Sequence, residues 1–366
     1  MGTSRSMVVT EPGHMEMRTF PLPELGEEDG LLKVELVGVC GSDPGIFKGK
    51  ASRAPRPYPL ILGHEIVGRV AAMGAKALAR HKVAIGDRVI VEYAFGCGQC
   101  APCLAGRYTL CRKFMCYGSM VGCSEPPHLY GAYGDYLYLP PRAMVHKIGD
   151  DMSPEVGVMV GAVLGNAVRW LSQIGGCRLG QTVAIVGPGQ QGICATMVAK
   201  ASGAGPIMVV GLERDRKRLD MARRCGADLI VAADREDPVE ALARLTGGDL
   251  AQVVMDVSGH PSGAAQAIAL AGIGATVVLP GLYGAATQVP LLLDTVVFRE
   301  LKVLGAYSQD FASVETAIAL ARGGAFPLDE MISHRFPLAR AEEAVRLVAG
   351  EGGGEPPMKV VIDPSL

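Results

Sequence analysis

Two patterns of hydrophobic and polar positions divide the chain. Up to about residue 155, apolar residues form short runs with partial alternation, as at 31–39 and 88–91, separated by glycine and proline. Such runs predict β-strands, and no long amphipathic helix is evident among them. From about Gln181, short continuous apolar runs alternate with helical segments. This second pattern is typical of parallel βαβ units.

The second region contains a regular series of predicted elements. Its first strand is followed by glycines and by a helical stretch that ends near Lys200, and the tail of the chain has an amphipathic helical pattern at 338–349. A last strand is expected at 359–362, where it could return to the first domain. Further strands are expected at 182–186, 206–210, 228–231, 251–256 and 275–279, and a further helix at 214–225.

Composition agrees with a folded protein of two domains. The chain has 366 residues, of which 49% are hydrophobic and 20% charged, so it can bury substantial cores. Its formal net charge of −2 argues against a nucleic-acid-binding protein, which normally carries a basic excess. The longest uncharged stretch, 257–293, is interrupted by glycine and proline and does not predict a membrane span.

Cysteine usage points to metal binding. Four of the ten cysteines lie between Cys97 and Cys111, and the chain does not resemble a short, cystine-dense secreted domain. No secretory signal pattern is visible at the N-terminus, so we expect a cytoplasmic protein.

The cysteine cluster has the spacing of a closed metal site. Cys97, Cys100, Cys103 and Cys111 are separated by two, two and seven residues, which lets four thiolates converge on one ion. Four thiolates are typical of structural zinc. An iron–sulfur cluster uses similar ligands, and a zinc ribbon in contact with nucleic acid is disfavoured by the charge balance.

A second group of residues could form an open metal site. Cys40, Ser42 and Asp43 follow the strand predicted at 31–39, and His64 and Glu65 lie further along. A thiolate, an imidazole and a carboxylate would hold zinc with one position left for water or substrate. Each residue also has an ordinary interpretation, in which Cys40 is a small buried side chain, His64 a hydrogen-bonded histidine and Glu65 a surface charge.

The order of motifs resembles the zinc-dependent medium-chain alcohol dehydrogenase family of the medium-chain dehydrogenase/reductase superfamily. The similar segments are 38–43, 63–68, 86–89, the four-cysteine loop and 298–305, so that the resemblance extends over essentially the whole chain. It implies an α/β protein with a chaperonin-10-like β-rich catalytic domain at 1–155 and 307–366. It also implies a doubly wound Rossmann domain at 156–306.

The resemblance also implies roles for single residues. Cys40, His64 and Glu65 would be ligands of a catalytic zinc, and Asp43 would orient the histidine. Many family members have a fourth ligand just before the nucleotide-binding domain, but 156–168 contains no Cys, Asp, Glu or His. The fourth position is therefore expected to hold water or substrate, with Glu65 moving on and off the metal.

A second departure from the family concerns the proton relay. Where the family often has a relay histidine, this chain has Gly45. Ser42, the inner hydroxyl of the relay, is retained, so the outer step must use water or another group. Tyr93 and Phe95 are candidates for the walls of a substrate pocket, and packing residues at a strand end are an equal alternative.

A glycine-rich motif predicts a dinucleotide site. Gly187, Gly189 and Gly192, with Gln190 and Gln191 between them, follow a predicted strand and open a predicted helix. In this context the glycines make the turn, let the backbone approach pyrophosphate and let the helix pack on the strand. The helix N-terminus would then face the phosphates. The alternative is an ordinary turn in another doubly wound protein.

The choice of cofactor depends on the residue that meets the adenosine ribose. Glu213 lies 21 residues after Gly192, which favours NAD. If the residues after the glycine motif are counted without a gap, Gly211 and not Glu213 falls at the usual position of the acidic residue. Arg214, Arg216 and Arg218 could then bind the 2′-phosphate of NADP, or they could be a solvated helix face.

The sequence thus predicts a zinc-dependent, NAD-linked alcohol dehydrogenase. It would transfer a hydride reversibly between a small alcohol or its ketone and the cofactor, with the hydroxyl proton leaving through Ser42. The resemblance favours secondary alcohols or polyols, and the likeness of 275–293 to the family's dimerisation strand implies a homodimer or homotetramer. No nucleic-acid or membrane partner is expected.

Two other functions remain at this stage. A zinc-independent NADPH quinone or enoyl reductase would share the fold, although Cys40, His64 and Glu65 argue against it. A metal-stabilised binding protein would leave the glycine motif unexplained.

Overall fold

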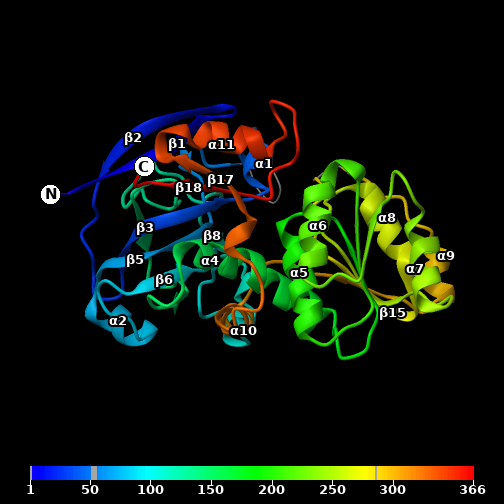
Figure 1. Ribbon diagram of the computed structural model, residues 1–366. Helices are drawn as coiled ribbons and strands as arrows, with labels where there is room; N and C mark the ends of the chain where they lie inside the picture. Colours follow the sequence, from blue (N-terminus) through cyan, green and yellow to red (C-terminus); the bar gives the residue numbers. More distant parts are fainter. Residues whose placement is uncertain (1, 51–55, 285–286) are drawn as a thin grey trace. The chain divides into compact units, whose positions relative to one another are not determined.

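The computed structural model describes residues 2–50, 56–284 and 287–366 and divides into two compact units (Figure 1). Unit 1 comprises Met1–Ala162, Asp310–Gly324 and Leu328–Leu366, and unit 2 comprises Val163–Gln309 and Ala325–Pro327. The sequence placed the two main boundaries at 155/156 and 306/307. In the described ranges, no helix is both long enough and apolar enough to span a membrane.

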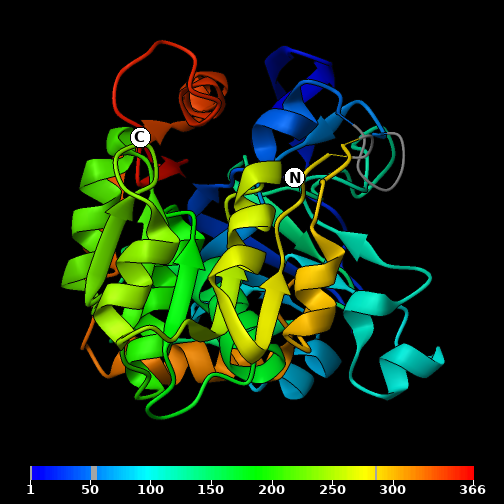
Figure 2. The same cartoon turned by 90° about the vertical axis from the view of Figure 1, so that its right-hand side faces the viewer.

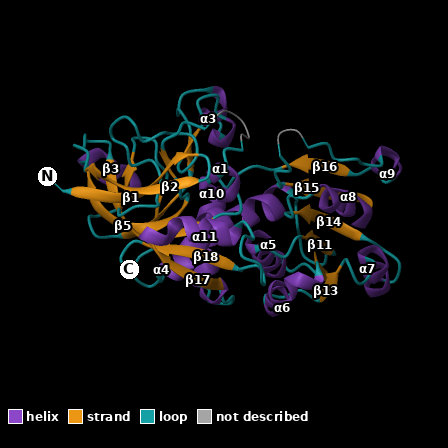
Figure 3. Cartoon of the chain, turned by 90° about the horizontal axis from the view of Figure 1, so that it is seen from above, coloured by secondary structure: helices purple, strands orange, loops and turns teal. Residues whose placement is uncertain are grey.

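Unit 1 is built mainly of antiparallel strands (Figure 3). Its largest sheet has the order β10-β6-β5-β3-β18-β17, with β9 also paired to β3, and smaller sheets have the orders β2-β1-β4 and β7-β8. The last strand of the chain, β18, pairs antiparallel with β3, which confirms that it returns to the first domain. The strands are β1 (Thr3–Glu11), β2 (His14–Pro21), β3 (Gly30–Val39), β4 (Leu60–Ile61), β5 (Glu65–Met73), β6 (Arg88–Val91), β7 (Ala94–Phe95), β8 (Met115–Cys116), β9 (Tyr136–Leu139), β10 (Val145–Lys147), β17 (Ile332–Pro337) and β18 (Lys359–Asp363).

The helices of unit 1 are mostly short. The predicted C-terminal helix is α11, preceded by a 3-10 turn, and its buried residues Ala341, Ala344 and Val345 follow the helical spacing. The charged residues of that helix therefore lie on its opposite face. The helices are α1 (Asp43–Phe47), α2 (Ala75–His81), α3 (Ala101–Leu104), α4 (Pro154–Met159), α10 (Phe311–Arg322) and α11 (Ala341–Val348).

Unit 2 is a six-stranded parallel sheet with helices on both faces. The strand order is β13-β12-β11-β14-β15-β16, and every neighbouring pair is parallel. Helices α5 and α6 pack together on one face, and α7 and α8 pack together on the other (Figures 1 and 2). The elements are β11 (Val183–Val186), α5 (Gln190–Ala201), β12 (Ile207–Gly211), α6 (Arg216–Arg224), β13 (Leu229–Ala232), α7 (Pro238–Thr246), β14 (Ala251–Asp256), α8 (Pro261–Leu270), β15 (Ala271–Leu279), α9 (Leu293–Phe298) and β16 (Lys302–Gly305).

The direction of the chain across this sheet reverses between β11 and β14. The chain first adds β12 and β13 on one side of β11, then returns to add β14, β15 and β16 on the other. Such a switch point is where doubly wound sheets bind dinucleotides, beyond the carboxyl ends of the strands. The two-part α/β fold expected from the sequence is thus confirmed.

The segment 156–180, for which the pattern predicts no element, is largely helical. After α4 the chain continues through two π-helical stretches, Val160–Gly165 and Val168–Ile174. Almost every side chain from Gly157 to Leu171 is buried. A helix buried on all sides has no polar face, so its period does not appear in the sequence.

Candidate metal and cofactor sites

Pairing of β3 with β5 creates the open metal site in unit 1. Gly38 on β3 lies opposite Glu65, the first residue of β5. Cys40 directly follows β3 and His64 directly precedes β5, so the pairing brings these two side chains to the same end of the sheet. Shortly after Cys40 the chain enters α1, which begins with Asp43.

Asp43 supports the histidine from behind. Its side chain is fully buried, and its Oδ2 accepts hydrogen bonds from the Cys40 N–H and the Tyr133 hydroxyl, both at 2.9 Å. Its Oδ1 lies 3.4 Å from His64 Nδ1 and, within the described residues, has no hydrogen-bond partner. This arrangement assigns the Nδ1 proton to the side facing Asp43 and leaves Nε2 free to bind a metal.

The surroundings of His64 favour a cation. Burial by itself lowers the pKa of His64, but the negative charges of Asp43 and Cys40 outweigh it and raise the pKa well above its ordinary value. The Ser42 hydroxyl lies 3.5 Å from His64 Nε2 and is exposed to solvent. A thiolate, an imidazole and a buried carboxylate suit zinc, so the donor set fits the metal predicted from the sequence.

Glu65 is placed differently from the other predicted ligands. Its carboxylate forms an ion pair with Lys359 of β18, and both side chains are completely buried. Gly38 makes room for this pair, since a Cβ atom there would collide with both charged groups. Among the described residues, only the four-cysteine group brings at least three Cys, His, Asp or Glu ligand atoms within 4.8 Å of one another.

The sequence reasoning missed Lys359 and Tyr133. Lys359 directly precedes the apolar run 360–362 of β18, and a charged residue joined to such a run is the signal that could have marked it as a buried partner. Of the two aromatic candidates, Tyr93 lies beside His64 with ring centroids 5.7 Å apart. Phe95 is buried against Tyr117 at 5.3 Å, as a packing residue would be.

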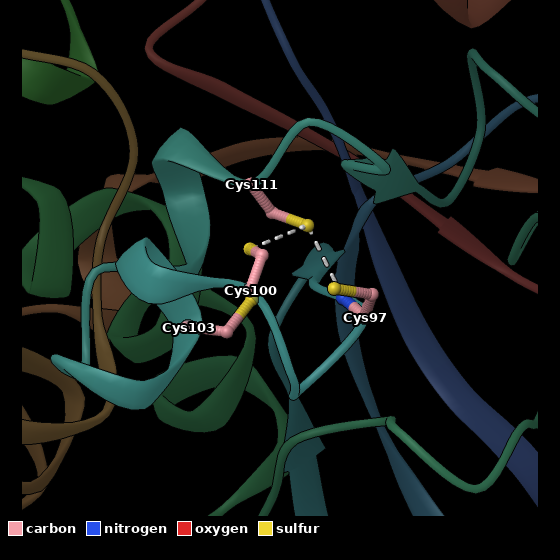
Figure 4. Close-up of side chains that lie close together, drawn as sticks. All are labelled: Cys97, Cys100, Cys103 and Cys111. Atoms are coloured by element: carbon pink, nitrogen blue, oxygen red, sulfur yellow. Dashed lines mark hydrogen bonds between the residues drawn. The ribbon is translucent and has the colours of Figure 1, made fainter.

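The four-cysteine loop forms the closed site (Figure 4). The Sγ atoms of Cys97, Cys100, Cys103 and Cys111 all lie within 4.8 Å of one another. Cys111 Sγ lies 3.7 Å from Cys100 Sγ and accepts the backbone N–H groups of Cys97 and Lys113 at 3.3 and 3.2 Å. Backbone N–H groups of Gln99 and Cys100 lower the pKa of Cys97 to about 6. Four converging sulfur atoms held by backbone donors fit a structural zinc ion.

Glycine at 96 allows this loop to close. A Cβ atom at Gly96 would lie 2.6 Å from Cys103 Sγ, much closer than a carbon–sulfur contact permits. The rest of the loop is short helical turns, α3 and the 3-10 turn Tyr108–Leu110, which carry Cys103 and bring the chain to Cys111.

The glycine-rich turn of unit 2 has the shape that a dinucleotide needs. Gly187 has a φ of 104°, and a Cβ there would lie 2.8 Å from the Ser258 backbone nitrogen. A Cβ at Gly192 would collide with the Gly187 carbonyl, whereas a Cβ at Gly189 would meet no atom within 4 Å. The open space lies in front of the first turn of α5, which starts at Gln190 and continues with Gln191. These observations fit a pyrophosphate at the helix N-terminus.

The end of β12 presents one exposed acid. Glu213 follows this strand and is exposed, and its N–H donates to Asp234 at 2.9 Å. Gly211 does not have room for a side chain, because its Cβ would lie 2.6 Å from Pro188 Cγ. Arg218 donates to Asp215 at 3.2 Å, and burial lowers the pKa of this arginine.

Comparison with known proteins identifies the family. The model of the alcohol dehydrogenase GroES-like domain matches residues 26–150, and that of the zinc-binding dehydrogenase matches residues 192–322. A "Probable alcohol dehydrogenase" of Mycobacterium tuberculosis is 40% identical, covering 98% of each chain. The chain belongs to the zinc-binding alcohol dehydrogenase family. It is therefore an NAD(P)-dependent oxidoreductase that acts on CH–OH groups, as the sequence predicted.

Two further relatives of this alcohol dehydrogenase extend the comparison. The erythritol/L-threitol dehydrogenase of Mycolicibacterium smegmatis is 30% identical and is covered over 98% of its length by 99% of this chain. A zinc-binding dehydrogenase of Sinorhizobium meliloti 1021, solved with bound NADP, is 28% identical, with full coverage of both chains and a TM-score of 0.87.

Proposed function

We propose that Cys40 and His64 hold a catalytic zinc ion and that Asp43 fixes the histidine for this purpose. The observation that carries the proposal is the buried Asp43 carboxylate, which faces His64 Nδ1 and so directs Nε2 to the site. Zinc held there would act as a Lewis acid on the alcohol oxygen, and the nicotinamide would accept the hydride.

Ser42 would carry the hydroxyl proton. Its Oγ lies beside His64 Nε2 and is open to solvent, so a proton taken up at this hydroxyl can be passed on to water. Gly45, which replaces a relay histidine of the family, has no atom within 4 Å of the place of its Cβ. Water in this open space would supply the outer step of the relay.

Glu65 would be a reversible ligand. Lys359 neutralises its carboxylate inside the protein, and this pairing competes with coordination of a metal by Glu65. The segment 156–168 offers no alternative ligand, so the remaining position is left for water or the substrate oxygen. Replacement of Lys359 by Met would free Glu65 and is expected to tighten metal binding at the site.

NAD is the favoured cofactor. Glu213 is free to accept hydrogen bonds from the ribose hydroxyls and would repel a 2′-phosphate. Of the three arginines that could bind that phosphate, Arg218 is already paired with Asp215 and Arg216 with Asp220. The Sinorhizobium meliloti relative was solved with NADP, so the comparison of NAD with NADP is part of the test below.

The four cysteines would hold a second, structural zinc ion, giving two per chain. The substrate would be a secondary alcohol or a polyol, and the named relative that acts on erythritol and L-threitol supports this class. The solvent-exposed position of Ser42 suits a hydroxyl-rich substrate.

We further propose that the enzyme is a cytoplasmic homodimer or homotetramer. Strand β16 forms one edge of the sheet in unit 2, and exposed apolar side chains lie on the neighbouring elements. Phe298 is 82% exposed and Ile273 87%, more than a solvated surface normally shows for such residues. Other exposed apolar residues there are Leu292, Leu293 and Val297.

A screen of alcohols and ketones with NAD and NADP, together with the zinc content of the same preparation, tests the proposal. We expect two zinc ions per chain, activity on secondary alcohols or polyols, and faster turnover with NAD. A single zinc ion per chain and activity only with NADPH and a quinone or enone would instead establish the zinc-independent reductase.

A further inference from the structure

Unit 2 contains a buried carboxylate that the proposed function does not use. Asp256 is the last residue of β14 and is completely buried. Its Oδ1 accepts the backbone N–H of Ser258 at 2.9 Å, and its Oδ2 accepts the Tyr283 hydroxyl at 2.6 Å. In the part of the chain that the structure describes, no Lys, Arg or His forms a salt bridge with it. A buried negative charge without a cation is costly and calls for a physical reason.

This carboxylate lies beside the glycine-rich turn. Asp256 is the register partner of Val186, the last residue of β11, and the chain enters the turn at the next residue, Gly187. Ser258 meets the turn directly, because a Cβ on Gly187 would lie 2.8 Å from its nitrogen. The Asp256 carboxylate is therefore at the switch point of the sheet, next to the proposed pyrophosphate site.

Tyr283 links a second loop to the Asp256 carboxylate. It follows β15, and burial together with the Asp256 charge raises the pKa of its phenol, which therefore remains a neutral donor. Gly281, on the same loop, lies close to Gly259, since its Cβ would be 3.3 Å from the Gly259 Cα. The ends of β11, β14 and β15 thus meet around one carboxylate.

The strand order of the sheet indicates which half of the cofactor would lie near Asp256. The β12 side carries Glu213 and would take the adenosine, so the β14 and β15 side takes the nicotinamide half. The nicotinamide ring is a cation in the oxidised cofactor and neutral in the reduced one. A negative charge in a poorly solvated site acts strongly on that difference.

We propose that the negative charge of Asp256 makes the enzyme bind the oxidised cofactor in preference to the reduced one, which favours oxidation of the alcohol. This inference rests on the proposed binding of a dinucleotide at Gly187–Gly192. Asp256 acts through the electrostatic field of its charge and needs no contact with the reacting atoms, so its role is charge selection. The experiment follows binding, not turnover.

The test compares the dissociation constants of NAD and NADH. NAD is titrated by calorimetry and NADH by fluorescence, with the intact zinc-loaded enzyme. Asp256→Asn keeps the size of the side chain and removes its charge. The substitution is expected to raise the dissociation constant of NAD about tenfold and to change that of NADH by less than about twofold. This is the effect of one unit charge acting within roughly 10 Å. Asp220→Asn removes an equal charge from an exposed position on α6 and should leave the ratio of the two constants unchanged.

Two substitutions at Tyr283 keep the test decisive if Asp256→Asn does not fold. Tyr283→Lys places a cation against the carboxylate and should weaken the binding of NAD relative to that of NADH, as Asp256→Asn does. Tyr283→Phe keeps the negative charge and should retain the preference within about twofold.

The outcomes separate this inference from the function on which it rests. Equal weakening of NAD and NADH in Asp256→Asn, or no weakening of either, overturns the charge-selecting role. A shift of the ratio in Tyr283→Phe as large as the shift in Tyr283→Lys overturns it as well. Failure of the unaltered enzyme to bind either cofactor would instead overturn the proposed dinucleotide site.

Discussion

The two candidate metal sites of unit 1 are assembled in opposite ways. The closed site takes all its sulfur atoms from a single loop of 15 residues, 97–111, and holds them with backbone N–H groups. The open site takes Cys40 and His64 from the ends of two paired strands and supports them with the buried side chains of Asp43 and Tyr133. The closed site can stabilise its own loop, whereas the open site requires the folded sheet.

This difference separates stability from chemistry. A closed set of four thiolates leaves no position for a substrate, so its metal contributes folding energy. The open site keeps a solvent-exposed hydroxyl beside the histidine and a buried acid behind it, an arrangement that supports proton transfer. Substitutions in the two sites should therefore affect different measurements.

The largest effect on activity is expected from Cys40→Ser. Loss of a thiolate ligand should remove the catalytic metal and lower kcat/KM by about a thousandfold or more, since Lewis-acid stabilisation of the alkoxide is lost. Zinc analysis should fall from two ions per chain to one, and Tm should change little. An undiminished rate in this variant would contradict the assignment of the catalytic site.

Cys103→Ser should have the opposite profile. The closed site would lose its metal, and Tm should fall by about 5–10 °C, because each kcal/mol of lost stability lowers Tm by roughly 2–4 °C in a domain of this size. Activity per folded molecule should be retained at low temperature. Cys116→Ser, a buried cysteine outside the cluster, is the matched control and should keep both zinc ions.

The same contrast explains what the sequence could predict. The closed site was predictable because its ligands are close in the chain and their spacing alone brings them together. The fold of unit 2 was predictable because buried parallel strands and helices alternate regularly, and β11, β12 and β14 lie within a residue of their predicted ranges. Both signals are local.

The open site shows the limit of local signals. Its residues were found through a resemblance to a family, and the contacts among them depend on which strands pair. The partner of Glu65 comes from Lys359, almost 300 residues away, and no short pattern predicts that ion pair. Tyr133 and Asp256 were missed for the same reason, because each gains its role from a hydrogen bond that the tertiary fold creates.

Asp43→Asn tests the support of the open site with a smaller expected effect. The amide keeps the shape of the carboxylate but not its charge, so the hold on the His64 Nδ1 proton weakens. We expect kcat/KM or zinc affinity to fall about 10–100-fold, as is usual when an outer partner of a metal ligand is changed. Competition with a chelator measures the affinity. Loss of zinc from the four cysteines instead would show that the two sites are not independent.

The smallest effect concerns a buried network next to the closed site. Tyr108, within the cysteine loop, donates to Glu92, and His146 lies between Glu92 and Glu315 at 2.9 and 2.5 Å. Burial lowers the pKa of His146, but the two carboxylates outweigh it and raise the pKa above its ordinary value. The charged histidine therefore stabilises the fold fully below about pH 6.5, and this contribution is lost as the pH rises through the raised pKa.

Glu315→Gln removes the half-exposed member of this network. Because solvent screens that carboxylate, we expect a loss of only about 0.5–1 kcal/mol in the free energy of unfolding. The loss should be present at pH 5.5 and should shrink toward pH 9, as measured by denaturant titration. Glu24→Gln, at a position outside the network, should show no such pH dependence. A loss for Glu315→Gln that grew with pH would contradict a charged His146 in the folded protein and, with it, the ionic network beside the closed site.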